Sequence, residues 1–143
     1  MKSGHRVFLL DDDELIVSML ARSLKKAGFE VYAETDAEGW MEKIETFAPD
    51  AVLLDIRMPE YDGLEILQQI RESQLNTQVI MLTSDDTAET AVKAMKMGAA
   101  DYLTKPFNKE EVKIVINNVI ENQLLKQEVR YLRNAYSDRK SVV

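Results

Sequence analysis

Short apolar runs alternate with longer amphipathic segments along the chain. The runs predict buried strands at residues 7–10, 31–33, 51–54, 79–82 and 102–103. Between them, apolar positions recur every three or four residues, which predicts helices at about 14–27, 37–47, 63–71 and 87–97 and a long one from about 108. Five such strand–helix units predict an α/β fold with a five-stranded, doubly wound parallel sheet, right-handed crossovers and an extended C-terminal helix.

Composition narrows the functional classes without choosing one. The chain has 143 residues and a net charge of −7, which argues against direct binding to nucleic acid. No apolar run approaches the roughly 20 residues of a membrane span, so we expect a cytoplasmic protein without a membrane partner. The sequence contains no cysteine, which excludes disulfides and thiolate chemistry.

Polar residues follow four of the predicted strands. Asp11 and Asp12 follow the first, Asp55 the third and Thr83 the fourth, and Lys105 lies just beyond the fifth. Because open parallel sheets place their sites outside the carboxyl ends of the strands, we expect these side chains to meet at one rim. Clustered carboxylates with little histidine suit a hard cation such as Mg2+. A carboxylate beside such an ion can attack phosphorus while a lysine neutralises the transferring group.

Each of these residues also has an ordinary structural interpretation. An isolated Asp11–Asp13 run is more often a helix N-cap with acidic first-turn residues, and Asp13 keeps that interpretation here. Asp55 and Thr83 could likewise be caps, and Lys105 could be a solvated loop charge. Four unrelated local roles are together a much less favourable explanation than one shared site.

A family resemblance rests on five segments that occur in this order: LLDDDE, LLDIRMPEYDG, VIMLTS, GAADYL and TKPF. Over roughly residues 5–122 the chain resembles the receiver domains of bacterial two-component response regulators. The resemblance implies a phosphoacceptor switch rather than an enzyme, with self-phosphotransfer and slow autodephosphorylation only. It implies that Asp55 accepts a phosphoryl group from a sensor histidine kinase. Mg2+ would bind Asp12 directly, Asp11 through water, Asp55, and the backbone carbonyl of Arg57.

The same resemblance assigns roles to the remaining rim residues. Thr83 and Lys105 would contact the phosphoryl oxygens, and Tyr102 would be an aromatic switch residue that turns from exposed to buried. The Lys105–Pro106 peptide bond resembles a cis bond of the family. We expect the surface of the fourth helix, fifth strand and fifth helix to report the phosphorylated state, because only the drawn-in conformation satisfies the added charge.

The MPEYDG turn follows the expected nucleophile strand. Pro59 restricts the backbone, and Gly63 permits conformations that other residues avoid, so together they would hold Asp55 rigidly. Two flanking positions, Arg57 and Asp85, would tune the access of a hydrolytic water, with an effect of undetermined sign.

A second class of protein offers an alternative. Asp11-x-Asp13 after an apolar strand, followed later by Thr83 and Lys105, also resembles the haloacid-dehalogenase phosphatases, in which Asp11 would be the nucleophile. Three features oppose it: Lys105 is followed by no acidic pair that would complete the metal site, the length leaves no room for a cap domain, and the MPEYDG turn would have no role. The phosphorylated residue, Asp11 or Asp55, separates the two hypotheses.

The C-terminal segment predicts a coiled-coil seam. Its apolar positions are spaced by four, three and four residues, with an asparagine at the preceding core position: Asn122, Leu125, Val129, Leu132 and Tyr136. Opposite charges flank this seam, with acids at the g positions and bases at the following e positions: Glu121, Glu128, Lys126 and Arg133. We therefore predict a receiver at 1–122, a helical linker at 123–143 and a parallel homodimer through the linker. A solvated, frayed tail is the alternative, because two heptads are few.

The tail and the DIRMP segment resemble regulators of the sigma-54-dependent enhancer-binding class, in which an ATPase domain and a DNA-binding domain follow the receiver. The sequence contains no phosphate-binding GxxxxGK loop. We therefore expect a regulatory fragment that serves an output domain outside this sequence. A free-standing receiver with a dimerising tail is the alternative.

Overall fold

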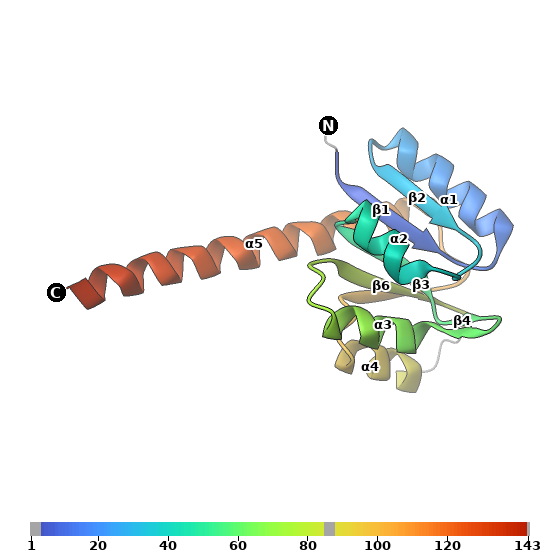
Figure 1. Cartoon of the computed structure of the whole chain (residues 1–143). Helices are drawn as coiled ribbons and strands as arrows, with labels where there is room; N and C mark the ends of the chain where they lie inside the picture. Colours follow the sequence, from blue (N-terminus) through green and yellow to red (C-terminus); the bar gives the residue numbers. More distant parts are fainter. Residues whose placement is uncertain (1–3, 85–87, 143) are drawn as a thin grey trace.

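The computed structural model describes residues 4–84 and 88–142, with side chains up to residue 133 and at 135. Its main sheet has five strands, β1 (Arg6–Leu10), β2 (Glu30–Glu34), β3 (Ala51–Asp55), β6 (Gln78–Thr83) and β7 (Asp101–Thr104). All neighbouring strands pair in parallel, in the order β2-β1-β3-β6-β7 (Figure 1). The predicted doubly wound parallel sheet is confirmed.

Helices cover both faces of this sheet. They are α1 (Glu14–Lys26), α2 (Trp40–Phe47), α3 (Gly63–Glu72), α4 (Ala88–Lys96) and α5 (Lys109–Val142). One hydrophobic core joins α1 to the first half of α5, through residues such as Leu24 and Ile116. The other core joins α2, α3 and α4, through Ile44, Leu67 and Ala94. The sheet is therefore the middle of three layers.

The continuous apolar runs of the strands follow from this layering. In β1, Val7 and Leu9 enter the core under α1 and α5, whereas Phe8 and Leu10 enter the core under α2 and α3. All four side chains are fully buried. Since successive residues of a strand point to opposite faces, a strand covered on both sides needs apolar residues throughout.

Two local features differ from the predicted elements. A small antiparallel hairpin, β4 (Arg57–Met58) with β5 (Tyr61–Asp62), follows β3, and strands of two residues leave no periodic signal in the sequence. In addition, α2 begins at Trp40 rather than near residue 37. Before it, the Glu38 backbone N–H donates to the Asp36 carboxylate, and Gly39 adopts a left-handed φ of 72° that interrupts helical geometry.

The long helix α5 leaves the domain and projects from it (Figure 1). Its 34 residues correspond to a length of about 50 Å. The buried residues of α5 end with Ile120 within the described side chains, and most described side chains beyond it are exposed. Among the described residues, no helix is both long and apolar enough to cross a membrane.

Two predicted positions lie outside the described residues. These are Asp85, which was predicted to tune water access, and the side chain of Tyr136, which was predicted to lie on the seam.

Candidate functional site

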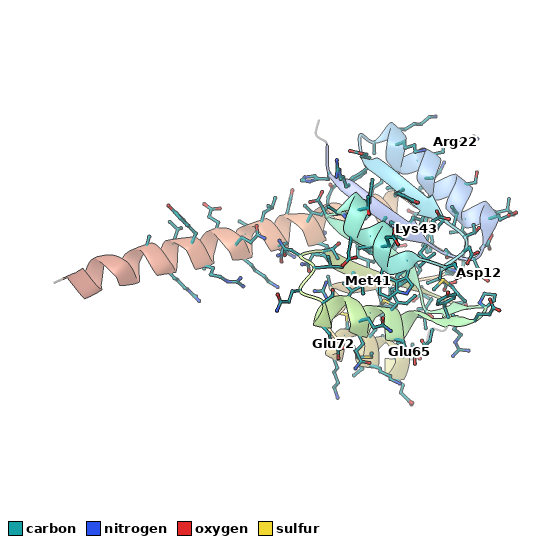
Figure 2. All side chains as sticks on the ribbon, in the orientation of Figure 1. Asp12, Arg22, Met41, Lys43, Glu65 and Glu72 are labelled. Atoms are coloured by element: carbon teal, nitrogen blue, oxygen red, sulfur yellow. The ribbon has the colours of Figure 1, made fainter. Side chains whose placement is uncertain are left out.

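A cavity of about 440 Å3 opens at the rim where β1, β3 and β6 end. Its lining combines acidic, basic and hydroxyl side chains: Asp12, Asp13, Asp55, Arg57, Thr83, Ser84 and Lys105. Asp12 lies at the opposite end of the domain from the point where α5 projects (Figure 2). The structure thus brings Asp12, Asp55, Thr83 and Lys105 to one cavity, as the strand ends predict.

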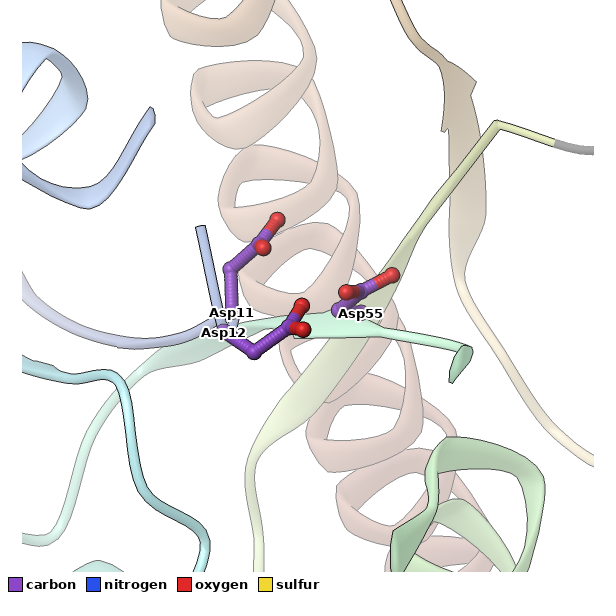
Figure 3. A group of neighbouring side chains, drawn as sticks. All are labelled: Asp11, Asp12 and Asp55. Atoms are coloured by element: carbon purple, nitrogen blue, oxygen red, sulfur yellow. The ribbon is translucent and has the colours of Figure 1, made fainter. Parts of the chain in front are cut away.

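Three carboxylates turn toward one another at this rim (Figure 3). One oxygen from each of Asp11, Asp12 and Asp55 lies within 4.8 Å of the other two. Asp11 is fully buried and Asp55 is 5% exposed, whereas Asp12 is exposed. Two of the three groups are therefore shielded from water, so their negative charge requires a cation or hydrogen-bond donors nearby.

Lys105 supplies one such cation. Its Nζ lies 2.7 Å from Asp11 Oδ2 and 3.6 Å from Asp55 Oδ2. Its backbone N–H donates to the carbonyl oxygen of Thr83 at 2.7 Å, which ties the segment after β7 to the end of β6. The Lys105–Pro106 peptide bond is cis, as the resemblance implies.

Backbone donors fix the two buried carboxylates. The Asp13 N–H donates to Asp11 Oδ1 at 2.9 Å, and the Arg57 N–H donates to Asp55 Oδ1 at 3.4 Å. Asp13 itself accepts from the N–H groups of Leu15 and Ile16, so it caps α1, as its ordinary interpretation predicts. The aspartate run therefore divides between site residues and a helix cap.

Burial changes the acidity of this site. Removal from water, with a further contribution from the negative charge of Asp11, raises the pKa of the Asp55 carboxyl from 3.8 to about 7, although Lys105 opposes the shift. Burial alone would lower the pKa of the Lys105 ammonium, but its contact with Asp11 and the charge of Asp55 raise it. In the absence of a further cation, Asp55 therefore resists ionisation at neutral pH.

Gly63 allows α3 to approach the end of β3 closely. Its N–H donates to the Ile56 carbonyl oxygen at 2.7 Å. A Cβ at this position would lie 2.2 Å from the Asp55 carbonyl oxygen and 2.8 Å from Ile56 Cα, and both of these are backbone atoms. The φ of Gly63 is not positive, so glycine is required here for space rather than for its conformational freedom. The contact fixes the backbone that carries Asp55.

The residues present fit a hard divalent cation. Carboxylate oxygens are the ligands that Mg2+ prefers, and Lys105 provides a single positive charge beside three carboxyl groups. Asp11 Oδ2 is buried and, despite the nearby ammonium, makes no hydrogen bond of good geometry within the described part of the chain. An acidic pocket with spare ligand capacity is the expected starting point for an ion that completes the site.

Tyr102 does not line the cavity. It lies on β7 beside Met81 of β6 and is 38% exposed, whereas Thr83 at the end of β6 is 3% exposed. The rim thus contains a buried hydroxyl, with a partly exposed aromatic residue on the neighbouring edge strand. Arg57 lines the cavity, in agreement with its predicted place beside the site. The sequence did not indicate that Asp13 also lines the cavity, because its role as a helix cap does not fix which other groups lie beside it.

Comparison with known proteins then places the chain. Residues 7–117 match the response regulator receiver domain. The chain belongs to this family. The match favours the receiver hypothesis over the phosphatase alternative, which the MPEYDG turn already opposed.

Two curated relatives illustrate the similarity of the receiver. This chain is 34% identical over 137 residues to the regulatory protein AtoC of Escherichia coli (strain K12), and the match covers 96% of this chain and 30% of AtoC. It is 35% identical over 115 residues to the alkaline phosphatase synthesis transcriptional regulatory protein PhoP of Bacillus subtilis (strain 168), covering 80% of this chain and 48% of PhoP. The chain therefore spans less than half of the length of either relative.

Solved structures agree with this placement. NtrX from Brucella abortus superposes with a TM-score of 0.82 at 32% identity, covering 89% of this chain and 29% of that one. The receiver domain of the Francisella response regulator 1452 superposes with a TM-score of 0.78 at 30% identity, covering 83% and 98% of the two chains. The second comparison shows that the fold described here corresponds to a whole receiver domain.

Proposed function

We propose that this receiver is a Mg2+-dependent phosphoacceptor switch in which Asp55 takes a phosphoryl group from the phosphohistidine of a sensor kinase. The observation that carries the proposal is the position of Asp55. Its carboxylate lines the cavity at the rim, within 3.6 Å of the Lys105 ammonium and beside two further carboxylates. These are the components that phosphoryl transfer to a carboxylate requires.

In the proposed reaction, an Asp55 carboxylate oxygen attacks phosphorus. The O–P bond forms, the bond from phosphorus to the histidine nitrogen breaks, and the imidazole leaves with that electron pair. Asp11, Asp12, Asp55 and the Arg57 carbonyl would hold Mg2+, which supplies positive charge to the transferring group. Lys105 would move its ammonium from the carboxylates toward the phosphoryl oxygens. Beyond this self-phosphotransfer and a slow hydrolysis of its product, we assign no enzymatic activity.

The switch would work through Thr83 and Tyr102. A phosphoryl group on Asp55 offers acceptor oxygens to the hydroxyl of Thr83, which lines the same cavity. Inward movement of Thr83 would vacate space, and Tyr102, now 38% exposed, would rotate into it. The α4–β7–α5 surface would then present a changed face to an output.

The tail of α5 is proposed to be a dimerising linker that begins near residue 123. In support, the predicted seam residues are exposed on the helix, with Leu125 at 57%, Val129 at 46% and Leu132 at 57%. Single apolar residues on a surface are common, but a line of them at heptad spacing is covered well by a second copy of the same helix.

We propose a sigma-54-dependent enhancer-binding output, based on the resemblance of the tail and the DIRMP segment. In support, the match to AtoC covers 96% of this chain and therefore includes most of the tail. The match to PhoP covers only 80% of this chain. A free-standing receiver with a dimerising tail is the alternative. Sedimentation of the natural full-length product would separate them, because only the first predicts domains after the tail.

The test of the phosphoacceptor is intact-mass spectrometry after incubation with Mg2+ and a small acyl-phosphate donor. We expect one added phosphoryl group, which disappears in Asp55→Asn and after metal chelation. Asp13→Asn is the matched control, because it also changes an aspartate that lines the cavity but keeps a side chain that can cap α1. An adduct on Asp11, or none together with no binding of beryllofluoride, would contradict the proposal.

A further inference from the structure

A side-chain hydrogen bond joins the start of the tail, at Gln123, to the receiver. The Gln123 side-chain amide donates to Asn76 Oδ1 at 3.1 Å, across 47 positions of sequence. Asn76 belongs to the loop between α3 and β6, which Figure 1 shows next to the point where α5 leaves the domain. Gln123 is half-buried, whereas its described neighbours from Leu124 to Arg133 are exposed.

The loop that carries Asn76 is held firmly at both ends. At its start, the Ser73 hydroxyl donates to the Ile70 carbonyl oxygen at 2.7 Å and so closes the last turn of α3. At its end, the Arg71 guanidinium donates to the Thr77 carbonyl oxygen. Thr77 is 2% exposed, and Leu75 packs against the core under α2 and α3.

Arg71 also connects this loop to α4. A Cβ placed on Gly98, just after α4, would lie 2.8 Å from Arg71 Cδ, so the arginine side chain crosses directly over that glycine. Arg71 therefore links the Thr77 end of the loop to the segment after α4, which limits the movement of the backbone that carries Asn76.

Helix geometry gives the Gln123 contact a consequence for the tail. Gln123 continues the face of Ile116 and Ile120, which pack in the receiver, at spacings of seven and three residues. Leu125, Val129 and Leu132 lie about 180–240° around the helix from Gln123. When Gln123 is held against the receiver, the apolar seam therefore faces away from the receiver.

We infer that residues 73–77 form a bracket, with Asn76 as its positioning residue, that fixes the direction in which the tail leaves the receiver. The bracket would turn the seam away from the receiver. Two tails could then pair along their seams, and each receiver would lie on the side of its own helix opposite the seam. This inference rests on the proposed dimer for its purpose, but the anchoring of Gln123 is independent of it.

The test is amide hydrogen exchange on the full chain, followed in peptides that cover residues 121–126. Asn76→Ala removes the acceptor, and we expect roughly three- to tenfold faster exchange there, as the loss of one neutral hydrogen bond implies. Asn76→Asp keeps an acceptor oxygen and should preserve the protection. Gln127→Ala, one turn beyond Gln123, is the control for a side-chain change at an exposed tail position.

Residues 112–119 provide an internal reference, because their protection comes from the core. Unchanged exchange at 121–126 in Asn76→Ala, or faster exchange in Asn76→Asp to the same extent, would overturn the bracket. Sedimentation of the same samples tests the dimer separately. If the natural chain is a monomer while the exchange pattern holds, the dimer fails and the bracket stands.

Discussion

The ammonium nitrogen of Lys105 lies 2.7 Å from the carboxylate of Asp11, which is fully buried. A carboxylate removed from water at this depth depends on its partner, because an unpaired buried charge is costly. Lys105 reaches Asp11 from the segment after β7, whereas Asp11 follows β1. The pair therefore joins the segment after the edge strand β7 to the end of β1, across the two intervening strands β3 and β6.

Replacing the lysine should expose this dependence. Lys105→Met leaves three converging carboxylates without their neighbouring ammonium, and we expect a loss of about 3 kcal/mol or more in the metal-free free energy of unfolding. Mg2+ should then stabilise the variant more than the natural receiver, because it offsets more uncompensated charge. Urea unfolding with a chelator and with Mg2+ measures both effects.

The control for this change is Lys113→Met. Lys113 pairs at 3.2 Å with Glu110, whose side chain is 76% exposed, so its loss should change stability by about 0.5 kcal/mol or less. A Lys105→Met variant as stable as the natural receiver in chelator would show that the Asp11 contact has no role in folding.

The second prediction separates two uses of glycine. Gly63→Ala places a Cβ 2.2 Å from the Asp55 carbonyl oxygen, and we expect it to lower the free energy of unfolding by about 3 kcal/mol and to weaken Mg2+ binding. Gly39→Ala meets nothing closer than Lys43 Cε at 3.9 Å and is strained only by its φ of 72°, so a loss of about 1 kcal/mol is expected. Thermal unfolding and Mg2+ titration test the pair. Equal losses of stability with normal metal binding in both variants would contradict the positioning role of Gly63.

The third prediction concerns pH. Because the pKa of Asp55 rises from 3.8 to about 7 on folding, the native state keeps a proton that the unfolded chain has lost between these values. The stability of the metal-free receiver should therefore fall as pH rises through this window, with the full penalty present above about 7. Asp55→Asn lacks this titration, so its stability advantage over the natural receiver should grow from pH 4.5 to pH 8 in chelator.

The same pH series with saturating Mg2+ in place of the chelator is the control for this prediction. The cation favours the ionised carboxylate, so the fall in stability of the natural receiver should become smaller. A constant difference between the natural receiver and Asp55→Asn across the pH range would show that Asp55 titrates as it does in water.

How much of this could be predicted from the sequence depends on the range of each signal. The strands, their parallel pairing and the meeting of Asp12, Asp55, Thr83 and Lys105 follow from apolar runs and from the rule that parallel strands end at one rim. These signals come from periodicity and from the rules of sheet topology, so they can be recognised in the sequence alone. The order of the strands in the sheet was not predicted. The cis bond before Pro106 came from the resemblance alone.

Contacts between separated backbones could not be predicted in the same way. The identity of Gly63 indicates a turn, but its approach to the carbonyl of Asp55 depends on how α3 packs on β3. Likewise, neither Asn76 nor Gln123 carries any signal for their hydrogen bond, because two amides on exposed segments are ordinary surface residues. The strands of the β4–β5 hairpin are too short to show a hydrophobic periodicity in the sequence.

The fourth prediction tests whether the proposed metal site can be weakened without a change in the stability of the fold. Asp12 is exposed and belongs to the carboxylate cluster, so Asp12→Asn should weaken Mg2+ binding about tenfold or more while changing stability by less than about 0.5 kcal/mol. Asp13→Asn lies one residue further and keeps its capping geometry, so its Mg2+ affinity should stay within about threefold. Titration calorimetry with Mg2+ compares the two, and similar losses in both would indicate a diffuse effect of charge rather than ligation by Asp12.

The last prediction tests the tail with two adjacent leucines. Leu125 is 57% exposed and lies on the predicted seam, whereas Leu124 is 52% exposed and lies about 100° away from it on the helix. A glutamate at position 125 would face its counterpart across a parallel dimer, where like charges at the core repel, so Leu125→Glu should give a monomer. Leu124→Glu adds the same charge at nearly the same exposure but outside the seam, and it should leave the dimer intact. Sedimentation equilibrium of both variants and of the natural chain distinguishes the cases, because a solvated tail would give equal monomer masses for all three, and a general charge effect would dissociate both variants alike.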